Sequence, residues 1–531
     1  MKTLTQLAIF LLASALLSWT APAGADPIDV VAAGPKVVTE PVETNTDTGL
    51  ESPTRATDYT LEAFPTNESL PELEFVSPGA GGSGHAARIT ARAGQAGLFT
   101  RRLPADKGQR ITFSVKLRAE GIQSVQLVAM PLPRRPVSRP RPPGAPARPR
   151  PGVGGGAPRP AAPPQGGPLF QPRRSKPVSG SFGWRTLRLD TSFTGNIDEA
   201  LFQVAVRGPG AVWIDDFSVA VHWPKRVAIP EKPAAPLLMM VLMHSETPRA
   251  YITNRQYFQA DATKYEEMAK MLNRYGARLT IQPEREFWLG AQKYDPDFLR
   301  RMHAKYGVSF SVHTHGPNPR TNPTRKDVLD YIKLRKDEME AMGSGPVTDL
   351  NGNFDQEDWD MFADAGIRSM TAYKNVRTQM GLFEMDHFYL HPWHPAGSPY
   401  QGEAVFARHR PGSRVVFLPG DGALHTRHHD RFAALAERCI RVALSRVRAD
   451  RVNVFYIVEH VGRFVSHRRG QSPLEYVRSQ DFRDDLELHE KLYRDFLAPL
   501  VEAGYIHYVI PPEAREKFEQ WEQKMGVAAR P

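Results

Sequence analysis

Two short segments in the C-terminal half of the chain combine imidazole and carboxylate groups at strand-like spacing. They are His313-Thr314-His315, which follows an apolar run, and His244-Ser245-Glu246, which follows another. Residues i and i+2 of a strand point to the same face, so the two outer side chains of each segment can converge. Imidazole and carboxylate are the usual ligands of Zn and similar divalent metals. We therefore predict a divalent metal site, with Zn as the expected ion, formed by His313, His315 and one or both of His244 and Glu246.

A metal in such a site would lower the pKa of its bound water to about 7 and polarise a substrate carbonyl. A nearby carboxylate would then serve as general base. Three residues are candidates for this catalytic role, because each lies in or just after an apolar strand-like run: Glu246, Asp421 and Glu459. The alternatives stay open at this point. Histidine pairs arise by chance among 17 histidines, and Asp421 sits in a Gly-Asp-Gly sequence that is also ordinary turn chemistry.

Other polar and aromatic side chains follow further apolar runs in the same half of the chain, and we predict that they contact substrate. They are Asn353, Tyr373, His391, Trp393, His394 and His460. Trp393 lies between a proline and a histidine, where an aromatic ring could stack on a sugar ring. A hydrogen-bonded structural role is the alternative for each histidine.

These residues need a scaffold that brings strand ends together. Between residues 237 and 526, seven to nine short apolar runs alternate with helical patterns such as 265–275, 326–342 and 431–448. Such alternation predicts parallel strands with helical crossovers. We expect a distorted (β/α)7-8 barrel, whose catalytic residues come from the C-terminal ends of its strands.

The preceding part of the chain has a different pattern. Residues 61–223 contain short runs of alternating apolar and polar residues, such as 110–117 and 184–189, which predict an all-β jelly-roll sandwich. Residues 224–236 hold four prolines and are expected to be a linker. The chain is thus predicted to be multidomain, as its length of 531 residues also requires.

A Pro/Arg-rich stretch at 131–178 interrupts the predicted sandwich. It holds sixteen prolines and ten basic residues with no acidic ones, and we expect a long disordered insertion. Without those ten charges, 58 basic residues face 58 acidic ones, so the net charge of +10 comes from this segment. A basic patch patterned for nucleic acid is therefore not expected. Adhesion of the segment to an acidic envelope glycan is the alternative role.

The N-terminal sequence predicts that the protein is exported. Lys2 precedes an apolar run at 7–17, and Ala23-Gly24-Ala25 fits a signal-peptide cleavage site. We expect a signal peptide over 1–25, a loosely ordered lead-in over 26–60, and a secreted or periplasmic protein without a transmembrane segment. Cys439 is the single cysteine, so no intrachain disulfide is possible.

Two resemblances to known protein families make the predicted function more specific. The strands that begin at Gly183-Trp184 and at Val212-Trp213-Ile214-Asp215-Asp216 resemble those of jelly-roll carbohydrate-binding modules. The stretches 242–246, 275–280 and 306–315 resemble the polysaccharide deacetylase family and its wider glycoside hydrolase/deacetylase barrel superfamily. The second resemblance implies metal-dependent removal of N- or O-acetyl groups, with a polysaccharide or cell-envelope glycan as partner.

The sequence departs from the deacetylase pattern at two points. The family's first motif carries two adjacent Asp, whereas this chain has His244-Ser245-Glu246. The family's two histidines are four residues apart, whereas His313 and His315 are two apart. A glycosidase with two of Glu246, Asp421 and Glu459 as its carboxylates, or a non-catalytic glycan-binding protein, are the alternative functions.

Overall fold

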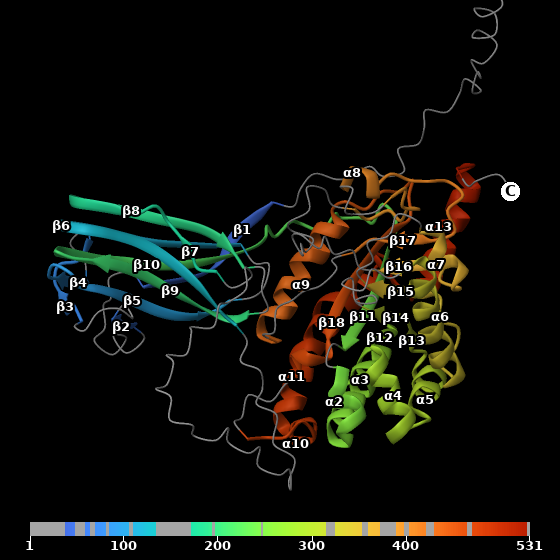
Figure 1. Cartoon of the computed structure of the whole chain (residues 1–531). Helices are drawn as coiled ribbons and strands as arrows, with labels where there is room; N and C mark the ends of the chain where they lie inside the picture. The colour runs from blue at the N-terminus through green and yellow to red at the C-terminus, as the bar shows by residue number, and fades with distance from the viewer. Residues whose placement is uncertain are drawn as a thin grey trace, which may run out of the picture.

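A computed structural model gives the structure of the chain over residues 38–47, 59–63, 70–80, 84–105, 110–133, 171–193, 197–245, 248–314, 324–352, 359–371, 389–397, 403–420, 429–464 and 470–527. An antiparallel β domain is followed by an α/β domain that contains parallel strands (Figure 1). This division confirms the predicted order of an all-β domain before an α/β domain. None of the helices in these ranges is long and apolar enough to cross a membrane.

The β domain consists of ten strands joined in one continuous hydrogen-bonded sheet. The strands are β1 Thr39–Asp47, β2 Tyr59–Ala63, β3 Glu72–Val76, β4 Ala86–Ala91, β5 Ala96–Pro104, β6 Arg110–Pro133, β7 Arg173–Arg174, β8 Val178–Ser192, β9 Ile197–Arg207 and β10 Gly210–Pro224. The sheet folds back on itself, because β6 pairs with β10 along its first half and with β9 along its second half.

Glycines form the corner of this fold. Gly210 has φ +126°, and a Cβ at this position would lie 2.5 Å from the carbonyl carbon of Gly121. Any other residue at position 210 would be both strained and too close to the Gly121 backbone, so β10 can begin this close to β6 only with glycine there. Beyond the corner the inner faces meet in one core, to which Val115 and Leu117 contribute from one half of β6 and Val125 and Leu127 from the other.

The structure differs from the sequence prediction at the start of this domain and at both ends of its predicted insertion. Residues 39–47, expected within a loosely ordered lead-in, form β1 and pair along β10. The predicted insertion is shorter than 131–178, because Pro131 and Pro133 extend β6 and Arg173–Arg174 form β7. Proline is tolerated at the end of β6 because, beyond Ala129, β7 no longer pairs with that side of the strand. The signal-peptide segment 1–25 and residues 134–170 lie outside the described residues.

The α/β domain begins at Leu237 after the extended segment 225–236. Its strands are β11 Leu237–Ser245, β12 Leu279–Pro283, β13 Ser309–Phe310, β14 Val312–Thr314, β15 Asp349–Gly352, β16 Ser369–Thr371, β17 Val416–Leu418, β18 Asn453–His460 and β19 Ile506–Tyr508. Its helices are α2 Pro248–Thr253, α3 Arg255–Arg274, α4 Arg285–Tyr294, α5 Phe298–Tyr306, α6 Arg325–Ala341, α7 Asp360–Asp364, α8 Glu403–Phe406, α9 His429–Leu444, α10 Pro473–Arg478, α11 Gln480–Lys491, α12 Ala498–Glu502 and α13 Pro511–Met525, with a 3-10 turn η6 Val461–Arg463 and a π-helical turn η7 Leu492–Leu497.

Within the described part of this domain all pairs of strands are parallel, and they form two sheets. One sheet has the order β13-β12-β11-β18, with β19 beside β11, and the other has the order β14-β15-β16-β17. Ser311 separates β13 from β14. No strand pairing joins β17 to β18 in the described ranges, where Trp393 instead forms a bridge to Phe417. The described residues therefore confirm the parallel α/β part of the predicted (β/α)7-8 barrel as two parallel sheets, and closure of these sheets into a complete barrel stays a prediction.

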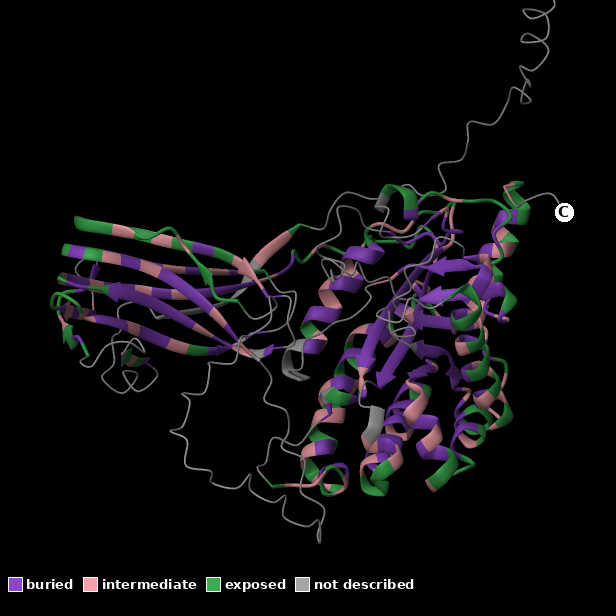
Figure 2. Ribbon diagram, in the orientation of Figure 1, coloured by how far each residue is buried: buried purple, intermediate pink, exposed green. Residues whose placement is uncertain are grey.

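Apart from β19, where His507 is exposed, the strands of both sheets are buried on both faces along most of their described length (Figure 2). On β11, Met239, Val241 and Met243 pack against the helices. The alternate residues Leu238, Met240 and Leu242 face β17 and β18 in a second, smaller apolar cluster. The face that carries this second cluster also carries the polar residues of β12 to β16, so the interior is apolar on one side and polar on the other.

The two domains contact each other where β10 meets α9. Arg438 of α9 donates to the Glu40 carboxylate at 2.7 Å and to the carbonyl oxygen of Pro224 at 2.9 Å, and its guanidinium lies over the Trp223 ring. A second ion pair, between Arg226 and Glu437, lies beside it. The β domain is therefore attached to the outer surface of the α/β domain through helix α9 (Figure 1).

Candidate functional site

Three histidines gather at the C-terminal ends of β11, β14 and β18. The ring centroids of His244 and His313 lie 4.5 Å apart, and those of His244 and His460 lie 5.2 Å apart. His244 and His313 are almost fully buried. The parallel register pairs His244 with both Gln282 and His460, which explains how residues so distant in the chain meet. The structure therefore brings together His244 and His313, two of the four predicted metal ligands, and adds His460 to them.

Two amide side chains orient the buried imidazoles. The Oε1 atom of Gln282 lies 2.6 Å from Nε2 of His244 and 2.8 Å from Nδ2 of Asn351. The Oδ1 atom of Asn351 lies 3.1 Å from Nδ1 of His313. An amide oxygen only accepts, so His244 donates from Nε2 and His313 donates from Nδ1. In the neutral rings, the lone pairs are then on Nδ1 of His244 and Nε2 of His313.

The buried carboxyl group of Asp349 lies close to these amides and imidazoles. Asp349 accepts hydrogen bonds from the hydroxyl groups of Ser311 at 2.6 Å, Ser369 at 3.0 Å and Thr371 at 3.1 Å. Burial raises the pKa of Asp349 from its ordinary value of 3.8 to about 7, because desolvation penalises the charge more than the hydroxyl groups stabilise it. The interior thus holds a carboxyl group that changes protonation near neutral pH.

The described residues fit part of a metal site. Histidines that bind metal characteristically donate their second ring N–H to an oxygen atom, as His244 and His313 both do. Within the described ranges, no three His, Cys, Asp or Glu side chains are placed to hold an ion together. Glu246 and His315, which the sequence predicts to complete the set, lie outside those ranges, as do Asn353, Tyr373 and Asp421.

Glu459 lies on the other face of β18. It is fully buried, and its Oε1 atom is 3.5 Å from Nδ1 of His489 on α11. The His489 ring packs against Phe432 and Phe464. Adjacent residues of a strand point to opposite faces, so Glu459 points toward the helices while His460 faces the histidine cluster. The structure does not bring this predicted catalytic residue to the cluster.

The predicted substrate residues His391, Trp393 and His394 lie at the opposite end of the domain. His391 donates to the carbonyl oxygen of Val452, and His394 to that of Val415, each at 2.8 Å. These carbonyls immediately precede β18 and β17, whereas the histidine cluster lies where the strands end. Trp393 is 1% exposed and donates to the carbonyl oxygen of Phe406, so its ring is part of the core and presents no face to a sugar.

The sequence reasoning missed the residues that orient the cluster, namely Gln282, Asp349, Asn351 and Thr371. A signal for them exists in the sequence. The pairs Thr280 and Gln282, Ser309 and Ser311, Asp349 and Asn351, and Ser369 and Thr371 each place polar residues two apart in otherwise apolar runs. Four strands with the same alternation predict one shared polar interior face.

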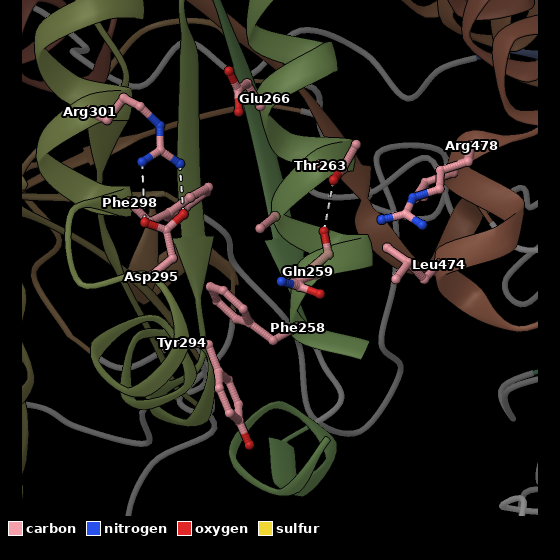
Figure 3. Close-up of a pocket in the computed structure, with 12 residues that line it drawn as sticks. Phe258, Gln259, Thr263, Glu266, Tyr294, Asp295, Phe298, Arg301, Leu474 and Arg478 are labelled. Atoms are coloured by element: carbon pink, nitrogen blue, oxygen red, sulfur yellow. Dashed lines mark hydrogen bonds and ion pairs between the residues drawn. The ribbon is translucent and has the colours of Figure 1, made fainter. Parts of the chain in front are cut away.

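A cavity of about 370 Å³ lies elsewhere, on the outer side of helix α3, between α5 and α10 (Figure 3). Arg301 pairs with Asp295 across its wall at 2.7 Å, and Thr263 donates to the backbone of Gln259 (Figure 3). It is lined by residues of α3, α5 and α10 and by Tyr294 and Asp295, and none of the histidines of the cluster lines it. We do not assign the functional site to it.

Comparisons with known proteins give likenesses of structure alone. No family model and no curated protein matches the sequence. The β domain is similar to a family 11 carbohydrate-binding module from Clostridium thermocellum, at 11% identity and a TM-score of 0.21, over 34% of this chain and 96% of the module. A 4-α-glucanotransferase from Thermococcus litoralis is 14% identical, with a TM-score of 0.36, over 53% of this chain and 40% of the transferase. The tailspike protein 4 of bacteriophage CBA120 is 10% identical, with a TM-score of 0.22, and this chain spans 20% of its length.

Proposed function

We propose that this protein is an exported, metal-dependent hydrolase that removes N- or O-acetyl groups from a polysaccharide or cell-envelope glycan. One observation carries the proposal. Two buried imidazoles, His244 and His313, lie side by side, and an amide oxygen holds one ring nitrogen of each. We propose that the second nitrogen of each ring, Nδ1 of His244 and Nε2 of His313, binds a divalent metal, for which Zn is the expected ion.

Each residue has a defined part in this proposal. Nδ1 of His244 and Nε2 of His313 would hold the metal, with Glu246 and His315 as the further ligands that their sequence positions predict. A bound metal supplies an activated water and a polarised acyl carbonyl. Glu246 or Asp421 would accept the proton from that water. His460, whose ring lies beside that of His244, would contact the substrate.

The described interior offers histidines for metal-dependent acyl hydrolysis, whereas Glu246 and Asp421, two of the carboxylates named for the alternative glycosidase, lie outside the described residues. A glycosidase requires two carboxyl groups about 5 to 9.5 Å apart on either side of the scissile bond. On the inward faces of the described strands, Asp349 is the one acidic residue, and it lies beneath the histidines and is 1% exposed. His244, His313 and His460 gather at the ends of the same strands. These imidazoles are the side chains that support the proposed histidine–metal chemistry.

The experiment is an assay of acetate release from acetylated polysaccharides, before and after treatment with a chelator. We expect loss of activity on chelation and its return when Zn²⁺ is added. His313→Ala should be inactive under both conditions, while His507→Ala, which removes an exposed histidine of β19, should behave like the unchanged protein. Full acetate release by the metal-stripped protein would contradict the proposal. Release of reducing sugar without acetate would favour the glycosidase.

A further inference from the structure

A buried carboxylate on helix α13 lies between two imidazoles, at the end of the domain opposite to the histidine cluster. Oε2 of Glu522 is 3.1 Å from Nε2 of His394, and Oε1 is 3.4 Å from Nε2 of His409. The three side chains are at most 8% exposed. Their partners within the protein therefore decide where the protons of this group lie.

His394 carries a proton on each ring nitrogen in this arrangement. Its Nδ1 atom is 2.8 Å from the carbonyl oxygen of Val415, and a carbonyl oxygen only accepts, so Nδ1 donates. In a neutral ring Nε2 would then hold a lone pair, which would face the Glu522 carboxylate oxygen at 3.1 Å. Two acceptors repel at this distance, so the contact requires one further proton. With that proton, His394 is an imidazolium paired with a carboxylate.

The neighbouring imidazoles are neutral. Nδ1 of His409 accepts from the backbone N–H of His394 at 3.3 Å, which places the proton of the ring on Nε2, facing Glu522. Burial and the nearby His394 lower the pKa of His409 to about 4. Burial also lowers the pKa of His391, which packs against Trp521 of α13, to about 3. Of these three imidazoles, His394 is therefore the one whose charge the contact with Glu522 requires.

Further charged groups lie around this pair on α13, at the start of β18 and beside His409. They are Arg408, Arg410, Asp450, Arg451, Arg515, Glu516 and Glu519. Arg515 lies near both glutamates, and Arg451 lies near Asp450, so these charges offset one another. Burial raises the pKa of Glu519. The imidazolium of His394 thus has the Glu522 carboxylate as its partner.

Helix α13 packs against the apolar interior at this end of the domain. Ala514 and Phe518 belong to the cluster formed with β11, β17 and β18, and Trp521 donates to the carbonyl oxygen of Asp450 at 2.8 Å. We propose that the proton held between His394 and Glu522 makes the attachment of α13 to these strands sensitive to pH, so that the helix loosens when this proton is lost. The inference goes beyond the proposed hydrolase activity and does not depend on it.

The direction of the effect follows from where the proton is bound. An imidazole in an unfolded chain releases this proton at about pH 6.5, whereas the attached helix retains it through the Glu522 carboxylate. The stability that the pair contributes is therefore complete below that pH and is lost as the pH rises above it. A single proton changes the equilibrium between attached and detached α13 by at most about tenfold per pH unit.

The test uses two variants of the full-length protein in which the contact no longer needs the extra proton. In Glu522→Gln, the NH₂ group donates to the lone pair of a neutral His394, while the amide oxygen faces His409. In His394→Gln, the new amide donates to the Glu522 carboxylate and does not titrate. Glu516→Gln, which removes an exposed carboxylate of the same helix, is the matched control.

Hydrogen–deuterium exchange with mass spectrometry gives the protection of α13 peptides at pH 6.5 and 8.5, corrected for the intrinsic exchange rate, with α3 peptides of the same protein as the reference. We expect the protection of α13 relative to α3 to fall about 10- to 100-fold in the unchanged protein and in Glu516→Gln, and by less than about threefold in the other two variants. Protection that does not change with pH in the unchanged protein would overturn the inference. So would an equal fall in Glu522→Gln or in His394→Gln, either of which decides if the other does not fold.

Discussion

Replacement of Asp349 by asparagine should change how the stability of the α/β domain depends on pH. Burial raises the pKa of this carboxyl group from 3.8 to about 7 in the folded protein. In the unfolded chain it returns to its ordinary value. Between these two values the folded state holds a proton that the unfolded state has released, so the stability that this group contributes is lost as the pH rises.

The size of the effect follows from the shift. Each pH unit between about 4 and 7 costs the unchanged protein about 1.4 kcal/mol of unfolding free energy from this group, or about 4 kcal/mol in total. Asparagine does not titrate, so Asp349→Asn lacks this slope. Relative to the unchanged protein, the variant should therefore gain about 1.4 kcal/mol for each unit between pH 4.5 and 6.5, with no further change well above pH 7.

The assay is urea unfolding followed by tryptophan fluorescence, since Trp288, Trp359 and Trp393 are buried in this domain. Curves are taken at half-unit steps from pH 4.5 to 8.5. Ser369→Ala, which keeps the carboxyl group, serves as the control and should retain the slope of the unchanged protein. Parallel stability profiles of Asp349→Asn and the unchanged protein between pH 4.5 and 6.5 would refute the reasoning, because they would show that folding does not raise the pKa of Asp349.

Two further predictions concern contacts that stabilise the α/β domain and its attachment to the β domain. Glu522 of α13 is a buried acceptor for His394 at 3.1 Å and lies 3.4 Å from His409, so Glu522→Ala should lower the unfolding free energy by about 3 kcal/mol in thermal or urea melts. Glu516→Ala on the exposed side of the same helix should change it by less than about 0.5 kcal/mol, and equal effects would contradict the assignment. Arg438→Ala should weaken the contact between the two domains and speed proteolysis within residues 225–236, whereas the exposed Arg448→Ala should leave the rate unchanged.

The sequence predicts the strands of the α/β domain well because their apolar runs are bounded by polar residues. The predicted strand 237–243 lies within β11, the predicted strand 278–282 lies within β12 except for Arg278, and the predicted strand 454–458 lies within β18. Which face of a strand points inward is harder to predict when both faces are buried. Glu459 and His460 are neighbours in the chain, yet one packs against α11 and the other lies beside His244. The pairing register of β18 with β11 determines which of these two side chains lies beside His244.

Which end of the strands a connecting segment contacts is equally hard to predict from the sequence. A strand predicted at 388–390 would place His391, Trp393 and His394 at the end where strands finish. In the structure, residues 389 and 390 form no strand, and the two histidines bond to carbonyls at the end where β17 and β18 start. Tertiary contacts with α13 hold them there, through Trp521 and Glu522. Such contacts leave no periodic pattern in the chain.

The most direct test of the proposed metal site is the Zn²⁺ content of the purified full-length protein, measured by elemental analysis together with His313→Ala and His507→Ala. We predict about one Zn²⁺ per chain in the unchanged protein and in His507→Ala, and a loss of most of it in His313→Ala. Equal metal content in all three proteins, or none in the unchanged protein even after incubation with Zn²⁺, would contradict the account.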